Sequence, residues 1–376
     1  MTINCRILLC LIVSLLCNFT VIAANQRQYS HELHHDGPYI FYDSIGNGAS
    51  IVSVTVEGAL IEQHLDSLPE SWTFCVRSED CKHSFDVQLH DVVRPSSVYN
   101  NASKTYVISD PHGNFDYFYS ILRAGNVIDS TYHWTFGDGH LVVIGDVMDR
   151  GVDATTIFWL IYKLEAEAWA EGGNVSFLLG NHEPLVLMND NRYTEDKYLA
   201  LADTLSIPCG QLYGPRTELG RWLTTRNTMM RIGRDLFVHA GLSADLYNAD
   251  LPMDTINAEI SRGLYLSKVQ RMEASDRIAF LFATFGPIWY RGLVRDDAKN
   301  KPVTPDTLQL ILDRYDADRL YVGHTIFPEV TQFYGGKVIG VNVDNAKAHK
   351  NKRNRAVLIQ GGQAILVNDE GRTLRL

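Results

Sequence analysis

The sequence predicts an α/β fold, in which helices cover the faces of a β-sheet. From residue 105 onward, short apolar runs rich in β-branched residues alternate with loops and longer amphipathic stretches. Polar residues follow directly after five of these runs, at the point where each strand is expected to end. The residues before 105 show short β-like runs and no helical period. We therefore expect one α/β domain over residues 105–376, preceded by a smaller β-rich region.

The first 24 residues have the pattern of a secretory signal peptide. Arg6 precedes an unbroken apolar run over residues 7–17, and residues 21–24 supply small side chains suited to a cleavage point. The apolar run is shorter than the roughly 20 residues that a membrane span needs, which disfavours a permanent anchor. We expect a signal peptide over residues 1–24 and a secreted or periplasmic protein, with no stable membrane anchor once the signal is removed.

Residues 25–104 are expected to form an N-terminal arm followed by a β-rich accessory region. Residues 25–38 are polar and rich in His, which favours a mobile arm and leaves a metal-binding cluster as the alternative. Residues 51–56 alternate between apolar and polar side chains, and the dipeptides Asn47-Gly48 and Glu57-Gly58 are turn signals. The polar run that follows Pro95 marks the boundary with the larger domain.

The larger domain shows a repeated order of strand, loop and helix. Helices are expected at residues 115–123 and 154–169, and Gly172 and Gly173 end the second one. The polar middle, residues 189–231, is expected to be a mostly helical insertion, and residues 250–316 to be helical with Pro breaks. Strands are expected at residues 105–109, 141–144 and 175–179, in the runs that lead to His239 and His324, and at residues 338–343, 356–360 and 364–367.

The charge of the chain argues against nucleic acid as a partner. The formal net charge is −10, and removal of the signal peptide takes away Arg6, which makes it −11. An acidic surface repels polyanions, because non-specific affinity for nucleic acid depends on Lys and Arg side chains that neutralise phosphates.

Three cysteines remain after the signal peptide, at positions 75, 81 and 209. Cys75 and Cys81 are close enough in sequence to form a disulfide across a short hairpin in an oxidising compartment. The alternative is three reduced, buried thiols.

The stretch from Gly145 to Gly151 follows the apolar run of residues 142–144 and carries two carboxylates and an Arg. Carboxylates at the end of a strand indicate a metal site. Asp146 is placed to bridge two cations, Asp149 to orient a neighbouring His, and Arg150 to bind an anion. The alternative interpretation is a Gly-Asp turn with a surface ion pair.

Similar polar residues follow the other strands. Each residue alone is a weak signal, because a His at the end of an apolar run is more often a hydrogen-bonded structural residue. Five such sites, all with oxygen or nitrogen ligands, indicate a site for two divalent ions such as Mn, Fe or Zn. The residues are Asp110, His112, Asp146, Asp149, Asn181, His182, His239 and His324.

In these residues the chain resembles the metallophosphoesterases of the calcineurin-like superfamily. The five blocks of that pattern are present as Asp110-Pro-His112, Gly145-Asp-Val-Met-Asp149, Gly180-Asn-His-Glu183, His239-Ala-Gly241 and Gly323-His324. The resemblance covers residues 105–344. Arg150 and Gly151 extend it toward the phosphoprotein phosphatase branch. Together with the secretory signal, they make the chain similar to the bacterial Shewanella-like phosphatases, a branch that includes a cold-active protein-tyrosine phosphatase.

The resemblance implies the metallophosphoesterase fold, with two packed mixed β-sheets flanked by helices and the metals in loops at one sheet edge. Residues 105–376 would then be the catalytic domain. One ion would be bound by Asp110, His112 and Asp146, and the other by Asp146, Asn181, His239 and His324. In addition to Arg150, the family places a second phosphate-binding Arg between its fourth and fifth blocks. Arg291 is the residue that corresponds to it. The alternative for Arg291 is a structural arginine.

The implied activity is phosphomonoester hydrolysis on phosphorylated proteins or peptides. A hydroxide that bridges the two metals attacks phosphorus in line, and His182, oriented by Asp149, protonates the leaving oxygen. Leu179 stands where the serine/threonine branch usually has Arg, so phosphotyrosine is favoured as substrate. A cysteine-based tyrosine phosphatase is excluded, because no Cys and Arg have the required spacing of five intervening residues.

Other functions remain open at this stage. They are a phosphoserine/threonine phosphatase, a small-molecule phosphatase, a symmetrical dinucleoside polyphosphate hydrolase and a non-catalytic binding module. Aromatic side chains near the Asp110 loop and near Arg291 could stack on a phenyl ring, although a buried core is the alternative use for at least half of them. These side chains are Phe115, Tyr117, Phe118, Tyr119, Trp289 and Tyr290.

Overall fold

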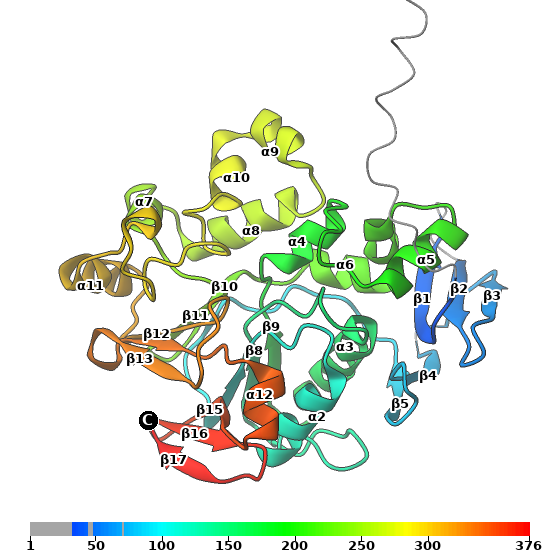
Figure 1. The fold of residues 1–376 in the computed structure, drawn as a ribbon, viewed down its shortest axis with the longest axis horizontal. Helices are drawn as coiled ribbons and strands as arrows, with labels where there is room; N and C mark the ends of the chain where they lie inside the picture. The colour runs from blue at the N-terminus through cyan, green and yellow to red at the C-terminus, as the bar shows by residue number, and fades with distance from the viewer. Residues whose placement is uncertain (1–31, 44–47, 70) are drawn as a thin grey trace, which may run out of the picture. The chain divides into compact units, whose positions relative to one another are not determined.

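Two six-stranded mixed sheets pack face to face in the computed structural model, which describes residues 32–43, 48–69 and 71–376 (Figure 1). One sheet has the strand order β17-β16-β15-β7-β8-β9, and the other has the order β13-β14-β12-β11-β10-β6. Helices flank the two sheets (Figure 1). The predicted α/β fold with two packed mixed sheets is confirmed. The predicted signal peptide and residues 25–31 of the predicted arm lie outside the described residues.

The first sheet contains the strands that were predicted at the start of the larger domain. Strands β7, β8 and β9 are parallel, with Val107 opposite Val142 and Val142 opposite Ser176. The crossover connections contain helices α2 and α3, as expected. The bounds are β7 (Lys104–Ile108), α2 (Phe115–Ala124), β8 (His140–Val143), α3 (Ala154–Ala170), β9 (Asn174–Phe177), β15 (Asn354–Gln360), β16 (Gln363–Asn368) and β17 (Thr373–Arg375).

The second sheet contains a strand that the sequence did not reveal. Residues 229–231 belong to the predicted helical insertion, but residues 229–232 form β10, which pairs antiparallel with β11 through the turn at Gly233. These residues form a strand because they pair with β11. The local sequence pattern does not show this pairing. The bounds are β6 (Val98–Tyr99), β10 (Met229–Ile232), β11 (Asp235–Val238), β12 (Arg319–Val322), β13 (Thr331–Phe333) and β14 (Val338–Gly340).

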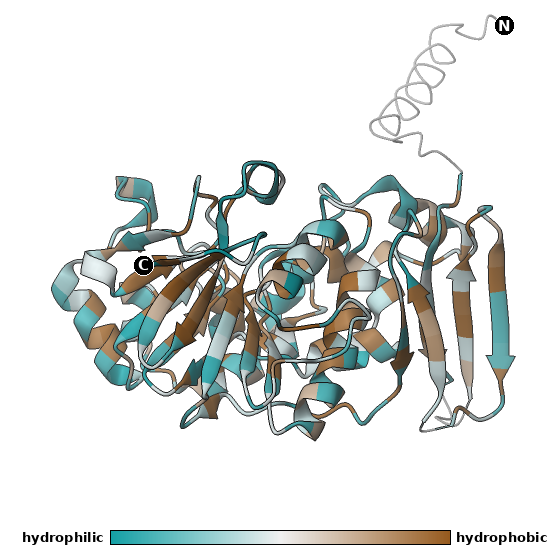
Figure 2. Cartoon of the chain, turned by 90° about the horizontal axis from the view of Figure 1, so that it is seen from below, coloured by the Kyte–Doolittle hydropathy of each residue, from teal (hydrophilic) through white to brown (hydrophobic). Residues whose placement is uncertain are grey.

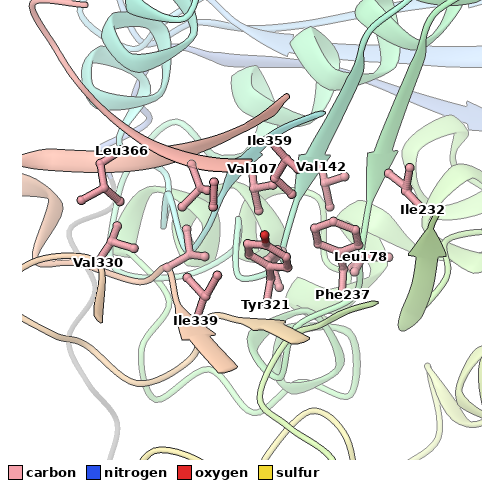
Figure 3. Packing of buried hydrophobic residues seen from close by; sticks show 14 of the residues in the cluster. Val107, Val142, Leu178, Ile232, Phe237, Tyr321, Val330, Ile339, Ile359 and Leu366 are labelled. Carbon is pink, nitrogen blue, oxygen red and sulfur yellow. The ribbon is translucent and has the colours of Figure 1, made fainter. Parts of the chain in front are cut away.

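The core lies between the two sheets (Figure 3). Val107 and Val142 extend from one sheet toward Phe237 and Tyr321 of the other, and all four side chains are fully buried. The rings of Phe237 and Tyr321 stack with centroids 5.1 Å apart. Figure 2 shows apolar residues concentrated on these central strands. The packed sheets therefore form a rigid base for the loops at their edges.

The polar middle of the chain contains a series of helices, as predicted for residues 189–231 and 250–316. A further helix, α12, follows β14 and was not predicted. No helix among the described residues has both the length and the apolar character needed to cross a membrane. The bounds are α4 (His182–Leu187), α5 (Asp196–Thr204), α6 (Glu218–Thr224), α7 (Ala244–Asn248), α8 (Met253–Gly263), α9 (Lys268–Ala274), α10 (Asp276–Leu281), α11 (Pro305–Arg314) and α12 (Asn345–Lys350).

The N-terminal region is β-rich, as expected. Strands β1 (Asp36–Tyr42), β2 (Ala49–Val54) and β3 (Leu60–Leu65) form a small antiparallel sheet, whose strand β1 contacts α3 and α6. Strands β4 (Thr73–Arg77) and β5 (Ser84–Gln88) form a hairpin.

The three cysteines of the described residues are unpaired thiols. Cys75 is exposed on β4 and its Sγ lies 3.2 Å from the Oγ of Ser84, whereas Cys81 lies in the turn of the hairpin and Cys209 is buried. The thiols are unpaired, as in the second alternative, but of the three cysteines in the described residues only Cys209 is buried.

Replacement of Phe237 by Ala tests the role of the core. We expect the variant to lose about 3–5 kcal/mol of unfolding free energy, because it leaves a cavity between two sheets that cannot close over it. Urea denaturation measures the change. Leu374→Ala on β17 is the control, since Leu374 is 62% exposed and its loss should cost less than about 0.5 kcal/mol. Equal losses for both variants would contradict this account of the core.

Candidate metal centre

The predicted site residues lie together at one edge of the two sheets. Parallel strands direct their carboxyl ends to the same edge, so the loops after β7, β8, β9, β11 and β12 meet there. The loops after β7 and β8 bring Asp110, His112, Asp146 and Asp149, and the other three bring Asn181, His182, His239 and His324. All of these side chains are buried except His112, which is partly exposed.

Asp146 is at the centre of the site. Its Oδ2 lies 3.1 Å from Nε2 of His239, 3.9 Å from Nε2 of His112 and 4.0 Å from Nε2 of His182. Two groups of ligand atoms overlap at this carboxylate. One contains His112, Asp146 and His182, and the other contains Asp146, His239 and His324, with the ligand atoms of each group within 4.8 Å of one another. A carboxylate shared by two groups is placed to contact two ions.

The imidazole orientations fit metal binding. Nδ1 of His239 lies 2.8 Å from the carbonyl oxygen of Ile144, and Nδ1 of His112 lies 2.9 Å from that of Met148. Because a carbonyl oxygen only accepts hydrogen bonds, both Nδ1 atoms must donate, which leaves the Nε2 atoms to act as ligands. Nε2 of His324 is buried and has no hydrogen-bond partner among the described residues. A buried nitrogen without a partner is costly unless a cation or another group satisfies it.

The oxygen atoms around Nε2 of His239 also favour a bound cation at this position. Its Nε2 lies 3.1 Å from Oδ1 of Asn181 and 3.1 Å from Oδ2 of Asp146, so three atoms with lone pairs converge in a buried space. Burial would lower the pKa of His239, but the Asp146 carboxylate raises it to about 9. Either a proton on Nε2 or a bound cation relieves the repulsion. The residues therefore fit a divalent ion.

Asp110 makes a different set of contacts from the other candidate ligands. Its carboxylate accepts hydrogen bonds from the backbone N–H of His324 at 3.1 Å, from Nδ2 of Asn342 at 2.7 Å and from Oγ of Ser109. Nδ2 of Asn345 donates to the Asp110 carbonyl oxygen at 3.0 Å. Asp110 belongs to neither of the two ligand groups described above. It holds the loops after β7 and β12 together at the centre.

The backbone of the site is strained. Asp110, Asp146, Asp149 and His324 have φ values of +48°, +54°, +69° and +61°, in the left-handed region that residues other than Gly rarely adopt. His112 and Arg150 share this conformation. Such strain persists only where surrounding contacts enforce it, and it is typical of functional sites.

Glycine is required beside the strained residues. Gly145 has φ +75°, and a Cβ there would lie 2.6 Å from the backbone nitrogen of Gly180 and 2.8 Å from Nδ1 of His239. The loops after β8 and β9 can therefore approach this closely only because Gly145 has no side chain.

Glu183 holds these two loops together. It is fully buried, and its carboxylate accepts hydrogen bonds from the backbone N–H groups of Val147 at 2.8 Å and Gly180 at 2.7 Å, and from those of Asp146 and Met148 at 3.2 Å each. Sequence analysis gave Glu183 no role, although it ends the Gly-Asn-His-Glu block. The side chain determines the direction of the Asp146 loop.

His182 and Asp149 form the expected pair. Nδ1 of His182 lies 2.7 Å from Oδ2 of Asp149, whose Oδ1 accepts a hydrogen bond of 2.8 Å from Thr194. Burial would lower the pKa of His182, but the carboxylates of Asp146 and Asp149 outweigh it and raise the pKa. Nε2 of His182 faces the centre.

The two arginines are held by different parts of the chain. The guanidinium of Arg150 is 4.8 Å from the ring centroid of Tyr193, which is 41% exposed and lies 5.3 Å from the His182 ring. Arg291 is partly buried, and its Nη1 donates to the carbonyl oxygen of His324 at 3.2 Å and to Oγ1 of Thr325 at 2.8 Å. Arg291 is thus tied to a ligand-bearing loop.

Few of the predicted aromatic side chains reach the site. Phe115, Phe118 and Tyr290 are buried in the core, each with at most 2% exposure. The ring of Trp289 lies 5.7 Å from that of His324, nearly perpendicular to it. Sequence reasoning missed Tyr193, Thr194 and Asn342. A polar Asn within the apolar run 338–343 is a signal for Asn342, but the other two lie in a loop without a pattern.

A comparison with protein families decides the identity of the fold. The family described as Calcineurin-like phosphoesterase matches residues 103–328, more than half of the chain. The chain belongs to this family. The predicted enzyme class, a metallophosphoesterase, is therefore confirmed.

Relatives of this phosphoesterase include an uncharacterized protein of Schizosaccharomyces pombe, which is 28% identical over 265 residues, 66% of this chain and 75% of the relative. The Shewanella-like protein phosphatase 1 of Plasmodium berghei is 27% identical over 227 residues, which cover 60% of this chain and 62% of that protein. The crystal structure of the cold-active protein-tyrosine phosphatase of a psychrophile Shewanella sp. has 30% identity and a TM-score of 0.81, and covers 91% of this chain and 99% of that one. The predicted similarity to the Shewanella-like phosphatases is confirmed.

Replacement of Glu183 by Gln tests the tie between the loops. The amide retains one acceptor oxygen but turns an NH₂ group toward N–H donors, so we expect a loss of about 1–3 kcal/mol of unfolding free energy and weaker metal retention. Denaturation and metal analysis measure both effects. Glu329→Gln, on an exposed residue, is the control and should behave like the parent protein. Unchanged metal content in Glu183→Gln would refute this role.

Proposed function

We propose that the protein is a dinuclear-metal phosphomonoesterase that acts on phosphorylated proteins, with a preference for phosphotyrosine. The observation that carries the proposal is the overlap of two ligand groups at Asp146, beside a His182 that Asp149 holds in place. The predicted signal peptide adds the proposal that the enzyme acts outside the cytoplasm. The charge of −10 makes nucleic acid an unsuitable substrate.

Seven contacts from six residues would hold two divalent ions of Mn, Fe or Zn. We assign one ion to Asp110, His112 and Asp146, and the other to Asp146, Asn181, His239 and His324. His182 belongs to the same ligand group as His112 and Asp146, but its Nδ1 contact with Asp149 suits a proton donor better than a ligand. Mixed carboxylate, amide and imidazole ligands suit borderline divalent ions. When bound, such ions activate water as a nucleophile and stabilise the negative charge of the phosphate.

The arginines bind the phosphate. Arg150 extends from the exposed rim, where Tyr193 supports its guanidinium, and Arg291 approaches from the loop of His324. A planar guanidinium can hold two phosphate oxygens at once. The two side chains would therefore bind the phosphate of the substrate and fix its orientation at the centre.

His182 supplies the proton for the leaving oxygen. Its Nδ1 donates to Asp149, which fixes the ring so that Nε2 faces the substrate. Thr194 holds the other oxygen of Asp149 and prevents rotation of the carboxylate. A proton donor within hydrogen-bond reach of the leaving oxygen is what ester cleavage requires.

Three observations support phosphotyrosine over phosphoserine. The relative with 30% identity and nearly complete coverage is a protein-tyrosine phosphatase. Leu179 is fully buried where a serine/threonine phosphatase usually has Arg, so no third arginine reaches the centre from that position. The partly exposed Trp289, close to His324, is an aromatic surface for a phenyl ring.

Activity should depend strictly on metal. We expect prolonged chelation to abolish turnover of para-nitrophenyl phosphate and of a phosphotyrosine peptide, and Mn or Zn to restore it, because the ligands on their own provide no nucleophile. Metal analysis of the same samples is the control. Full turnover in a verified metal-free sample would disprove the mechanism.

The role of His182 can be separated from metal binding by changing the leaving group. A tyrosyl oxygen has a conjugate acid of pKa about 10, far below that of an aliphatic alcohol, so it needs less help from a proton donor. We expect His182→Asn to slow hydrolysis of a phosphoserine peptide by a larger factor than that of a matched phosphotyrosine peptide. Values of kcat/KM for both peptides on both proteins give the result. A wild-type preference for phosphoserine would reject the tyrosine proposal, and equal slowing would reassign the proton donor.

A further inference from the structure

A pocket of about 570 Å³ begins at the metal centre and extends between α4, α9 and α10. Asn181, a proposed metal ligand, and Trp289 line one end, so a substrate held at the centre has direct access to the pocket. Lys268 and Arg271 of α9 line it as well. Figure 1 shows α9 and α10 beside α8, on the side of the molecule away from β17. We call this space the α9 pocket.

Most of the α9 pocket is apolar. Leu185 of α4 and Met188, which follows α4, line one part of it. Met272 of α9 and Phe282, which follows α10, line another. Met272 is 53% exposed, which is unusual for so large an apolar side chain. An apolar lining next to a phosphate site favours an apolar side chain of the substrate, because burial of such a side chain releases ordered water.

Arg271 adds a positive charge to this apolar pocket. Its side chain is only 6% exposed and lies 3.6 Å from the ring centroid of Phe282. Nε donates to the carbonyl oxygen of Gly263 at 2.9 Å and Nη2 to that of Leu264 at 3.2 Å, at the end of α8. These carbonyls accept two of the five N–H groups of the guanidinium.

No carboxylate of the described residues pairs with Arg271, and burial alone lowers its pKa, to about 10. A buried cation usually has an anionic partner. Lys268 on the same helix is exposed and lines the same pocket, so the α9 pocket carries two cations in a protein of net charge −10. A ligand with a carboxylate would satisfy both.

We propose that the α9 pocket binds the substrate residues that flank the phosphorylated one, and that it selects a peptide with an apolar residue followed by an acidic one. The inference rests on the proposed function, since it assumes a phosphopeptide at the centre. An extended peptide advances about 3.3 Å per residue, so the apolar and acidic residues lie within a few positions of the phosphotyrosine. The apolar side chain packs on Met272 and Leu185, and the acidic group pairs with Lys268 and Arg271.

The net charge of the protein would by itself disfavour acidic peptides. An acidic protein repels acidic peptides over long range, so the overall charge predicts slower reaction with them. A preference for acidic flanking residues can therefore come only from local cations such as those of the α9 pocket.

Matched phosphotyrosine peptides test the proposal. One series carries Leu-Glu-Glu on the N-terminal or the C-terminal side of the phosphotyrosine, and the other series carries Leu-Lys-Lys at the same positions. We expect one of the two acidic peptides to have a kcat/KM about fivefold above that of its basic counterpart, the size of effect that one or two partly exposed ion pairs give. Para-nitrophenyl phosphate, which has no flanking residues, reports whether the centre itself works.

Charge reversal at Lys268 is the decisive variant. Lys268 is exposed, so Lys268→Glu should fold, and we expect it to reduce the fivefold ratio to about one. Arg375→Glu on β17 changes the net charge by the same amount far from α9 in Figure 1 and should keep the ratio of the parent protein. Arg271 is not a suitable target, because its loss would also remove the hydrogen bonds to the end of α8.

A second variant tests the apolar part. A third peptide, with Ser-Glu-Glu in place of Leu-Glu-Glu, measures the advantage of Leu over Ser beside the phosphotyrosine. Met272→Ser should reduce this advantage, while melting temperatures of all variants check that they are folded. The same ratio in Lys268→Glu as in Arg375→Glu, or no preference in the parent protein, would overturn the inference. Absence of turnover of para-nitrophenyl phosphate by the metal-loaded parent protein would instead overturn the proposed function.

Discussion

The hydrogen bonds between the Glu183 carboxylate and four backbone N–H groups hold the loops after β8 and β9 in one arrangement. The position of Asp146 depends on this arrangement, because two of the four N–H groups belong to Asp146 and its neighbour. The backbone N–H of His182 in turn donates to Oδ1 of Asp146 at 2.9 Å. A buried carboxylate that only accepts hydrogen bonds thus orients a second carboxylate, and the imidazoles gather around the latter.

The two packed sheets and the helical insertions have different roles. The sheets are rigid and place polar side chains from five loops at one edge, which is the requirement for binding ions. The surroundings of the centre come from other elements: Tyr193 precedes α5, and the α9 pocket lies among α4, α9 and α10. The proposed chemistry and the proposed substrate choice therefore fall to different parts of the chain, and the second can change while the first is preserved.

The position of the candidate site could be predicted because each of its residues follows an apolar, β-branched run. Such runs report burial directly, and parallel strands place their ends together. β10 could not be predicted, because its partner β11 and not its composition makes it a strand. Asn342 and Thr194 contact Asp110 and Asp149 across long sequence separations, which no local pattern encodes. The α9 pocket likewise exists only through tertiary packing.

The left-handed backbone at Asp110, Asp146, Asp149 and His324 has a consequence for how this enzyme can be changed. Each of these residues stores conformational energy of about 1–3 kcal/mol that Gly or Asn at the same position would release in part. Selection for heat resistance alone would therefore favour replacements such as Asn, where the amide relieves the strain and keeps an acceptor oxygen, at the expense of the proposed metal ligands. Any directed evolution of this protein toward thermostability needs a simultaneous screen for turnover, or it will accumulate well-folded but inert molecules.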